Sequence, residues 1–211
     1  IKKDINKAIH YFKEASCYND SISKNYLGVI YKNGDGVPKN ILAAIEYFEE
    51  AIKIDNDIPS IYNLSRIYYF GIEIDQNKSK AIEILEKALS KPFTHIDFFL
   101  FFIYLFENMK EKRKSCFQKI QKEYPMLGDD LKNYKHMLKS KFISKNTFLS
   151  LLKNFDLVQD NYGLYLLEFH NKINEEVINL KLSHKYEQDN NHKNIDKLFY
   201  EGFGYELYSK H

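Results

Sequence analysis

The chain has 211 residues, of which 44% are hydrophobic and 28% are charged, and its formal net charge is +2. This length and composition predict a soluble chain that folds as one elongated domain or as a repeat array with a cap. The near-neutral charge disfavours nucleic-acid binding, which requires a broad basic surface. The longest apolar run, residues 98–106, is too short for a membrane-spanning helix, which needs about 20 residues.

A half-unit at the start of the chain sets a pattern that later residues repeat. Asp4 stands four residues before Ala8, and Phe12 and Ala15 follow at helical spacing. The short polar residue can accept a hydrogen bond from the free backbone amides of a new helix. The same half-unit returns twice, as Asn40, Ala44, Phe48 and Ala51 and then as Asn77, Ala81, Leu85 and Ala88.

A second motif precedes each of these later half-units, and its two copies are about 37 residues apart. The copies are Leu27, Gly28, Tyr31 and Gly34, then Leu64, Ser65, Tyr68 and Gly71. Apolar residues at three- and four-residue spacing predict an amphipathic helix around each copy. The small residue lets two antiparallel helices approach closely, while the aromatic side chains fill the space around it. A fixed period of this length predicts stacked helix hairpins, an all-α superhelix or solenoid.

The loop between the two motifs carries its own signal. Gly34 and Gly36 tolerate the positive φ that ends a helix and reverses the chain, and we expect Val37 to hold the loop inward. The whole pattern, Leu27-Gly28-x-x-Tyr31-x-x-Gly34-x-Gly36-Val37 followed by a capping residue and Ala44-x-x-x-Phe48-x-x-Ala51, resembles the Sel1-like repeat family, which is related to tetratricopeptide repeats. Tetratricopeptide repeats, the nearest competitor, have a shorter turn between their helices.

The resemblance is specific for residues 21–57 and looser for residues 58–90. In the looser unit Ser65 replaces the first glycine, and Ile72-Glu73-Ile74 replaces the Asp-Gly-Val of the loop. The resemblance implies an α-solenoid adaptor without catalytic activity, of the kind found in protein quality control, signalling complexes and pathogen–host interactions.

The aromatic run at residues 98–106 stands where the first helix of a third, degenerate unit belongs. Exposing its five Phe side chains would forgo roughly 2 kcal/mol each, so both faces of this helix must be covered. Two explanations stay open: C-terminal helices fold back over it, or its inner face receives apolar side chains of a partner. Residues 107–124 are the predicted second helix of this unit, and Pro125 ends it.

The C-terminal region, residues 125–211, carries no recognisable motif. Helices are predicted at residues 130–138, 144–155, 162–171, 173–186 and 195–208, with Ser144 as an N-cap. We divide the chain into a repeat array, residues 1–124, with units at 1–20 (partial), 21–57, 58–90 and 93–124 (degenerate), and this C-terminal region. The region is either further degenerate repeats that cap the solenoid or a distinct helical domain.

Residues that could perform catalysis or bind metal are scattered along the chain. The seven histidines form no HExxH pair, and no Cys-x-x-Cys motif completes a metal site. The closest approach to a cluster is Glu168 and His170 near Glu175 and Glu176, which we expect to face solvent. The sequence therefore predicts no enzyme, no catalytic residue, no cofactor and no metal site.

Cys17 and Cys116 are too few and too far apart to form a disulfide framework. We expect them to be reduced core residues in a reducing compartment, which favours the cytoplasm. Because the chain begins at Ile1 in the middle of a repeat, we expect it to be a trimmed piece that could have lost a signal peptide.

The predicted function is to bind a partner protein or peptide on the inner surface of the solenoid. In curved helix-pair solenoids the first helix of each unit faces the inner groove, and three positions around its small residue point into that groove. Counted from Gly28, Ser65 and Phe102, these positions are Asn25, Val29 and Lys32; Tyr62, Arg66 and Tyr69; and Phe99, Ile103 and Phe106. Tyr and Arg often anchor interfaces, and a peptide laid in a groove is a common recognition mode.

Two alternative functions stay open. The repeats would serve as a docking platform for a C-terminal helical regulatory or enzymatic domain, which a deep polar pocket within residues 124–211 would favour. Alternatively the solenoid would bind RNA by stacking Tyr62 and Tyr69 on bases and contacting phosphates with Lys32. A steep salt dependence of association would support RNA binding, which the near-zero net charge makes the weaker alternative.

Overall fold

The computed structural model describes residues 4–89, 95–141, 143–154 and 172–173, and every regular element in these ranges is an α-helix. The predicted all-α class is therefore confirmed. Contacts between Cα atoms divide the chain into two compact units. Unit 1 is residues 1–116 with 153–166, and unit 2 is residues 117–152 with 167–211. The predicted domain boundary after residue 124 stays a prediction.

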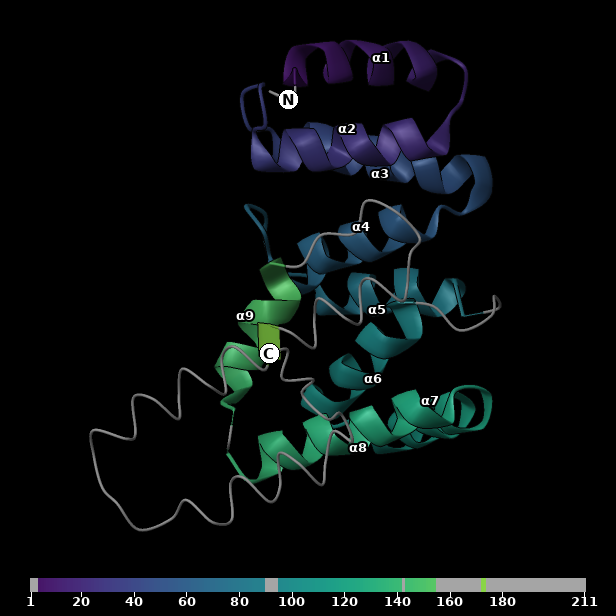
Figure 1. Ribbon diagram of the computed structural model, residues 1–211, viewed down its shortest axis with the longest axis vertical. Coiled ribbons are helices and arrows are strands. Elements are labelled where there is room, and N and C mark those ends of the chain that lie inside the picture. The colour runs from purple at the N-terminus through teal and green to yellow at the C-terminus, as the bar shows by residue number, and fades with distance from the viewer. Residues whose placement is uncertain (1–3, 90–94, 142, 155–171, 174–211) are drawn as a thin grey trace, which may run out of the picture. The chain divides into compact units, whose positions relative to one another are not determined.

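Unit 1 contains the helix hairpins of the repeat array. Its helices are α1 (Ile5–Cys17), α2 (Ser21–Asn33), α3 (Ile41–Asp55), α4 (Ile58–Phe70), α5 (Lys78–Lys87), α6 (His95–Phe106) and the first half of α7 (Lys110–Glu123). The helices α2 and α3 form one antiparallel pair and α4 and α5 the next, with α1 lying against α2 (Figure 1). The pairs stack on one another, which is the architecture that the sequence period predicts.

Short polar residues begin these helices. The side chains of Asp4, Asn40 and Asn77 each accept a hydrogen bond from the backbone N–H three residues later, which confirms their predicted role as N-caps. Asp20 and Asp57 do the same for α2 and α4. An N-cap stabilises a helix by about 1 kcal/mol. Five caps in equivalent places therefore fix where each helix starts and hold the repeats in register.

The loop after α2 reverses the chain as predicted. Gly34 and Gly36 adopt left-handed conformations with φ of 81° and 74°. Val37 packs beside them against a small apolar cluster of Ile9, Leu27 and Ile30. The loop is therefore held against both α1 and α2.

Glu73 occupies the position of Gly36 one repeat later and has a φ of 56°. A residue other than glycine is strained by roughly 1 kcal/mol in this conformation. We expect Glu73→Gly to raise the free energy of unfolding by about 0.5–1 kcal/mol, because the lost ion pair with Lys39 is largely exposed. Urea unfolding would measure the gain. Glu73→Ala, which loses the ion pair but keeps the strain, is the control, and equal stability of the two variants would contradict the expectation.

The small residues of the repeat lie where the paired helices come closest. Phe48 on α3 is fully buried, and a Cβ on Gly28 of α2 would lie 2.5 Å from a carbon of its ring. In the next pair the equivalent residues are Ser65 and Leu85. The larger residue on one helix thus faces the smaller residue on the other. The small position is thus larger and the large position smaller in the second pair than in the first.

Helix α6 is apolar on all sides and buried on all sides. Ile96 and residues 98–104 expose at most 3% of their surface. The Phe99 ring meets the rings of Tyr62 and Tyr69 on α4 edge-on, at centroid distances of 5.3 and 5.8 Å. The prediction that both faces of this helix are covered is confirmed.

Two tyrosine hydroxyls form hydrogen bonds that link α6, or the residue that follows it, to α5 and α4. Tyr69 donates to Glu107 at 2.9 Å, and Tyr104 donates to Glu86 at 2.8 Å. Each carboxylate also accepts from a lysine, Lys78 and Lys112 respectively. Burial and the nearby carboxylates raise the pKa of both tyrosines far above the ordinary value. Both hydroxyls therefore stay protonated and keep donating throughout the physiological pH range.

Unit 2 contains the second half of α7, α8 (Pro125–Lys139) and most of α9 (Lys145–Asn154). Pro125 follows the end of α7, as predicted, but it also begins α8, at a position where proline's missing N–H is not needed. Ser144 caps α9 by accepting from the Thr147 N–H at 3.0 Å, also as predicted. The helices predicted at residues 162–171, 173–186 and 195–208 lie outside the described residues, apart from Ile173, which is helical.

A half-buried carboxyl on α8 makes unit 2 sensitive to pH. Burial, together with the neighbouring Asp129, raises the pKa of Asp130 from 3.8 to about 6. The folded form binds this proton more tightly than the unfolded chain, so the contribution of Asp130 to stability falls as the pH rises from about 4 to about 6.

We expect Asp130→Asn to raise the free energy of unfolding at pH 7 by about 1–2 kcal/mol, a value reduced from the full shift because solvent screens the group. At pH 4 or below, the same substitution should change stability little, because the native carboxyl is already neutral. Thermal unfolding at both pH values measures this difference. An equal effect at the two pH values would contradict the expectation.

Candidate partner-binding surfaces

The residues predicted to line an inner groove lie on α2, α4 and α6 as expected, but most of them are inside the protein. Seven of the nine expose 8% or less of their surface: Asn25, Val29, Tyr62, Arg66, Tyr69, Phe99 and Ile103. Lys32 and Phe106 are partly exposed. The prediction that these residues contact a partner stays a prediction, and the buried seven would first have to become exposed.

A ladder of buried polar side chains joins α2 to α4. Asn25 Oδ1 accepts from Ser60 Oγ at 3.2 Å and from Asn63 Nδ2 at 3.1 Å. Arg66 Nη1 donates to Asn63 Oδ1 at 3.5 Å, and its Nη2 donates to the backbone carbonyl of Lys153. An unsatisfied buried polar group costs about 1–3 kcal/mol. These side chains therefore hold one repeat in register on the next.

An aromatic cluster continues this face toward α6. The Arg66 guanidinium lies 5.3 Å from the centroid of the Tyr62 ring, and the Tyr62 ring contacts Phe99. Tyr62 and Tyr69 expose 0% and 3% of their surface. Neither ring has an open face on which a base can stack. The RNA-binding alternative therefore lacks the aromatic platform that it assumed.

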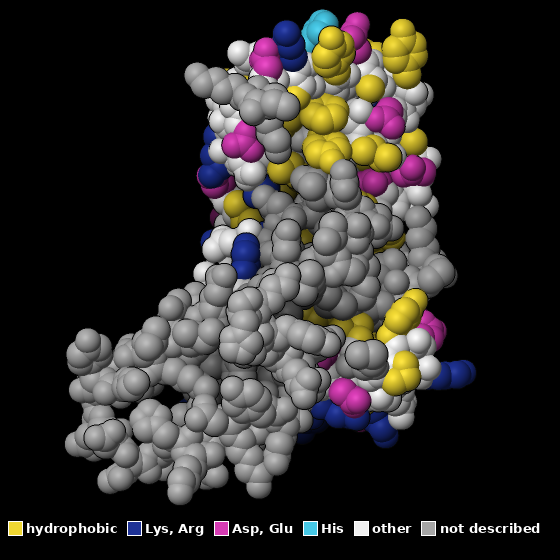
Figure 2. Space-filling view, in the orientation of Figure 1, with side chains coloured by type: hydrophobic (Ala, Val, Ile, Leu, Met, Phe, Trp, Pro, Cys, Tyr) yellow, Lys and Arg dark blue, Asp and Glu magenta, His cyan; other side chains and the backbone are white. Residues whose placement is uncertain are grey.

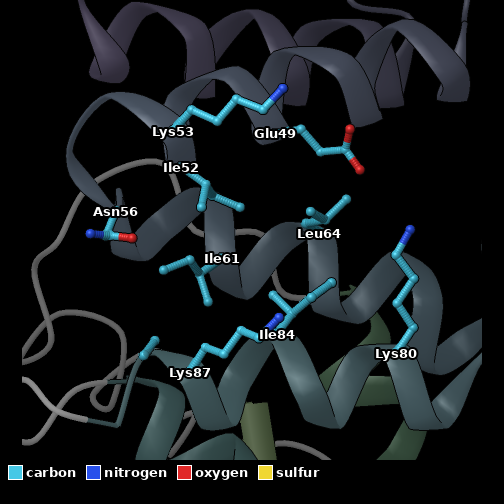
Figure 3. A pocket seen from close by; sticks show the side chains of 10 residues that line it. Glu49, Ile52, Lys53, Asn56, Ile61, Leu64, Lys80, Ile84 and Lys87 are labelled. Carbon is cyan, nitrogen blue, oxygen red and sulfur yellow. The ribbon is translucent and has the colours of Figure 1, made fainter.

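The sequence reasoning missed a groove between the second helices of two successive repeats. The groove lies between α3 and α5, with α4 beneath it, and has a volume of about 470 Å³ (Figure 3). Its apolar lining consists of Ile52, Ile61, Leu64, Ile84 and Ala88. Its polar lining consists of Glu49, Lys53, Asn56, Lys80 and Lys87. The groove thus combines an apolar floor with a rim in which lysines predominate.

The three rim lysines are held to different degrees. Lys80 Nζ donates to the Tyr68 hydroxyl at 2.6 Å and lies 4.0 Å from the centroid of its ring, so its position is fixed. Lys87 pairs with Glu83 at 2.7 Å, where both side chains are mostly exposed. The hydrogen bond from Lys87 lowers the pKa of Glu83. Lys53 has no ion-pair partner among the described residues.

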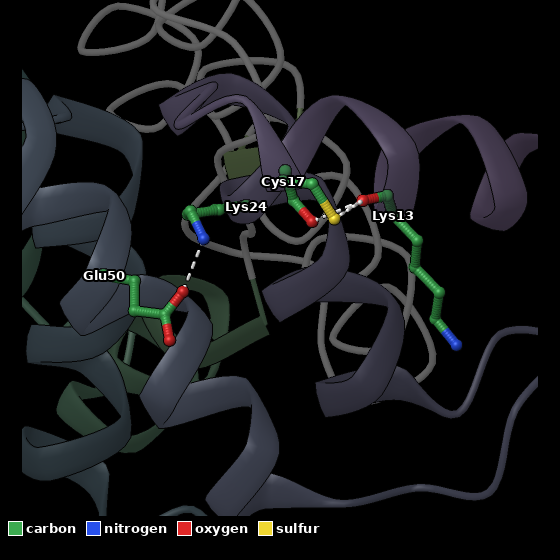
Figure 4. A network of polar contacts seen from close by, with 5 residues as sticks. Lys13, Cys17, Lys24 and Glu50 are labelled. Carbon is green, nitrogen blue, oxygen red and sulfur yellow. Dashed lines mark hydrogen bonds and ion pairs between the residues drawn. The ribbon is translucent and has the colours of Figure 1, made fainter.

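An ion pair joins the equivalent positions one repeat earlier (Figure 4). The positions of Ile61 and Lys87 are taken there by Lys24 and Glu50. Lys24 Nζ lies 2.5 Å from Glu50 Oε2, and the Lys24 side chain is only 11% exposed. A charged pair therefore spans the place where the later junction has an apolar floor and a rim lysine.

Cys17 occupies the place on α1 that Lys53 occupies on α3. Its thiol donates to the Lys13 carbonyl at 3.3 Å, and the residue is exposed. The prediction that Cys17 is a core residue is therefore wrong, because the position lies on the outer edge of its helix. Cys116 is partly buried.

Exposed apolar side chains gather over the α1–α2 end of unit 1 (Figure 2). They include Tyr11, Tyr18 and Ile22, which are 62%, 87% and 56% exposed. Helix α1 corresponds to the second helix of a repeat, and no first helix precedes it among the described residues. Ile5 accordingly is 38% exposed, whereas the equivalent Ile41 on α3 is 7% exposed.

Within the described ranges, no group of three or more His, Cys, Asp or Glu residues is placed to hold a metal ion. No helix in those ranges is long and apolar enough to cross a membrane. Glu168, His170, Glu175 and Glu176 lie outside the described residues, as does most of the region in which a deep C-terminal pocket was considered. The docking-platform alternative stays a prediction.

Comparison with protein-family models matches the Sel1 repeat at residues 1–17, 21–56 and 58–92. Comparison with curated proteins gave no match, and neither did comparison with solved structures. Sel1 repeats are generally protein-interaction modules, and the family is typically a non-catalytic scaffold. The resemblance stated from the sequence is confirmed. Three stretches of this chain, residues 1–17, 21–56 and 58–92, therefore match the Sel1 repeat.

Proposed function

We propose that this chain is a non-catalytic adaptor that holds a partner protein or peptide on its repeat array. The observation that carries the proposal is the presence of Sel1 repeats over residues 1–92, folded as stacked helix hairpins. Stacked repeats form a continuous surface to which several units contribute side chains. Such a surface suits a polypeptide, which makes many contacts along its length, better than it suits a small substrate.

The partner contact is best placed on the second helices of the repeats. The groove between α3 and α5 is open and has an apolar floor. On the first helices, by contrast, the buried polar ladder from Asn25 to Arg66 already joins one repeat to the next. Of the predicted inner-surface residues, only Lys32 and Phe106 are partly exposed, and they remain candidates for a secondary contact.

Affinity capture from the cells that make this chain, followed by mass spectrometry, tests the adaptor function. We expect the intact chain to retain one or a few proteins in near-stoichiometric amounts and to release them unmodified. A Phe48→Asp variant places a charge between α2 and α3, unfolds the array and should retain none of them. Equal retention by the two chains, or no retained protein, would contradict the proposal.

A further inference from the structure

We propose that the groove between α3 and α5 binds an acidic amphipathic segment of the partner protein. Apolar side chains of that segment lie on the groove floor, and its carboxylates pair with the rim lysines. This inference rests on the proposed adaptor function. It adds the location of the contact and the chemistry of the bound segment.

The floor provides apolar surface that a partner can cover. Ile61 and Leu64, at 3% and 2% exposure, are already packed and form a firm base. Ile52 and Ile84 are only partly buried, although both line the groove. Covering such surface gains about 25 cal/mol for each Å² removed from water. The groove therefore offers a favourable site for the apolar face of a bound segment.

The rim selects for negative charge. Lysines outnumber carboxylates on it even when Glu83, the neighbour of Lys87, is counted together with Glu49. Lys53 is without an ion-pair partner among the residues described. The pair of Lys87 with Glu83 is exposed, so it is worth at most about 1 kcal/mol and a partner's carboxylate can replace it. A basic segment would instead meet like charges on both sides of the groove.

The side chains at this junction differ from those at the same positions one repeat earlier. Lys24 and Glu50 fill the same place one repeat earlier with an ion pair. With Ile61 and Lys87 in these positions the ion pair is absent, and an apolar residue and a lysine line the groove instead. The side chains at this junction therefore give the groove its apolar floor and its lysine rim.

The length of the groove limits the bound segment. The lining residues on α5 and its C-cap run from Lys80 to Ala88, a distance of about 12 Å at 1.5 Å per residue. This corresponds to two to three turns of a bound helix. A volume of about 470 Å³ accommodates a few inserted side chains rather than a whole helix. The fitting partner is therefore a short segment with a few apolar anchors between acidic residues.

Selection of displayed random peptides on the intact chain tests this chemistry directly. Enriched peptides should carry Asp or Glu beside apolar residues at helical spacing. The strongest peptide is then synthesised with a fluorescent label, and its affinity for the wild-type chain and its variants is measured by fluorescence anisotropy.

Two variants locate the binding site. Ile61→Lys combined with Lys87→Glu copies the Lys24 and Glu50 pair into the groove and should lower peptide affinity about tenfold or more. Lys53→Glu combined with Lys87→Glu leaves the buried floor intact and should produce a similar loss, which guards against misfolding of the first variant. Thermal unfolding verifies that each variant is folded.

The matched control reverses two exposed lysines outside the groove. Lys110→Glu combined with Lys114→Glu on α7 makes the same change in net charge as the second groove variant and should leave peptide affinity unchanged. An equal loss in this control would show that overall charge, not the groove, governs binding, and would overturn the inference.

The remaining outcomes are also decisive. A basic or uncharged consensus, or affinity that neither groove variant changes, overturns the groove inference but leaves the adaptor function standing. If no peptide is enriched, the two groove variants are tested for capture of the cellular partner. Unchanged capture overturns the inference, and lost capture supports it. Failure of both the peptides and the cellular capture overturns the adaptor function as well.

Discussion

Serine in place of Gly28 is expected to lower the free energy of unfolding of the repeat array by about 2 kcal/mol. The added Cβ would lie 2.5–2.8 Å from three ring atoms of Phe48. That ring is fully buried, so moving it away from the added atom would disturb close packing. Serine is a better helix former than glycine by only about 0.5 kcal/mol, so the clash determines the sign.

A smaller residue at position 48 should relieve this clash. Phe48→Leu alone leaves a cavity and should cost about 1–2 kcal/mol, less than the 3–5 kcal/mol typical of Phe→Ala. Combined with Gly28→Ser, it reproduces the Ser65 and Leu85 pair of the next repeat. We therefore expect the double variant to be more stable than the sum of the single effects predicts, by at least about 1 kcal/mol.

Urea unfolding followed by far-UV circular dichroism measures all four members of this cycle. The matched control combines Gly28→Ser with Phe148→Leu, which makes the same Phe→Leu change on α9 in unit 2. That combination should be additive because the two residues belong to different compact units. Additivity of Gly28→Ser with Phe48→Leu as well would show that close packing of the paired helices does not depend on these two residues.

The features of the fold that could be predicted from the sequence depend on interactions between residues that are close together in the chain. The caps Asp4, Asn40 and Asn77 act on amides three positions away. Gly34 and Gly36 are required by their own backbone conformations. The burial of the aromatic run that begins at residue 98 could be predicted from hydrophobicity alone, whereas its assignment to a third repeat stays a prediction. Each of these inferences required no knowledge of distant parts of the chain.

The environment of the predicted site residues could not be obtained in the same way. Helical register placed Arg66 on the face shared with Tyr62, but its carbonyl partner, Lys153, is 87 residues further along the chain. Position on a helix predicts which side chains share a face. Whether that face is open depends on long-range contacts, which a single sequence does not specify.

The groove between α3 and α5 left a signal in the sequence that the repeat alignment could have revealed. Aligned at the repeat period, Lys24 and Glu50 correspond to Ile61 and Lys87. An oppositely charged pair is thus replaced by an apolar residue and a cation. The substitution predicts a lost ion pair, but only the structure shows that Ile52 and Ile84 from the two flanking helices converge on the same place.

Alanine in place of Tyr62 is expected to lower the free energy of unfolding by about 3–4 kcal/mol, in the range observed for other buried aromatic residues. Tyr62 has no exposed surface, contacts the Phe99 ring edge-on and lies beneath the Arg66 guanidinium. Its removal would leave a cavity between α4 and α6 and would deprive a buried cation of its aromatic neighbour.

Tyr11→Ala on α1 is the matched control, because the same truncation at a residue that is 62% exposed should change stability by less than about 0.5 kcal/mol. Thermal unfolding and partner capture should be measured on both variants. A large loss of stability at Tyr62 assigns this side chain to the contact between repeats. A variant that unfolds like the wild type but no longer captures the partner would instead support the inner surface as the binding site, since only a residue accessible to the partner produces that combination.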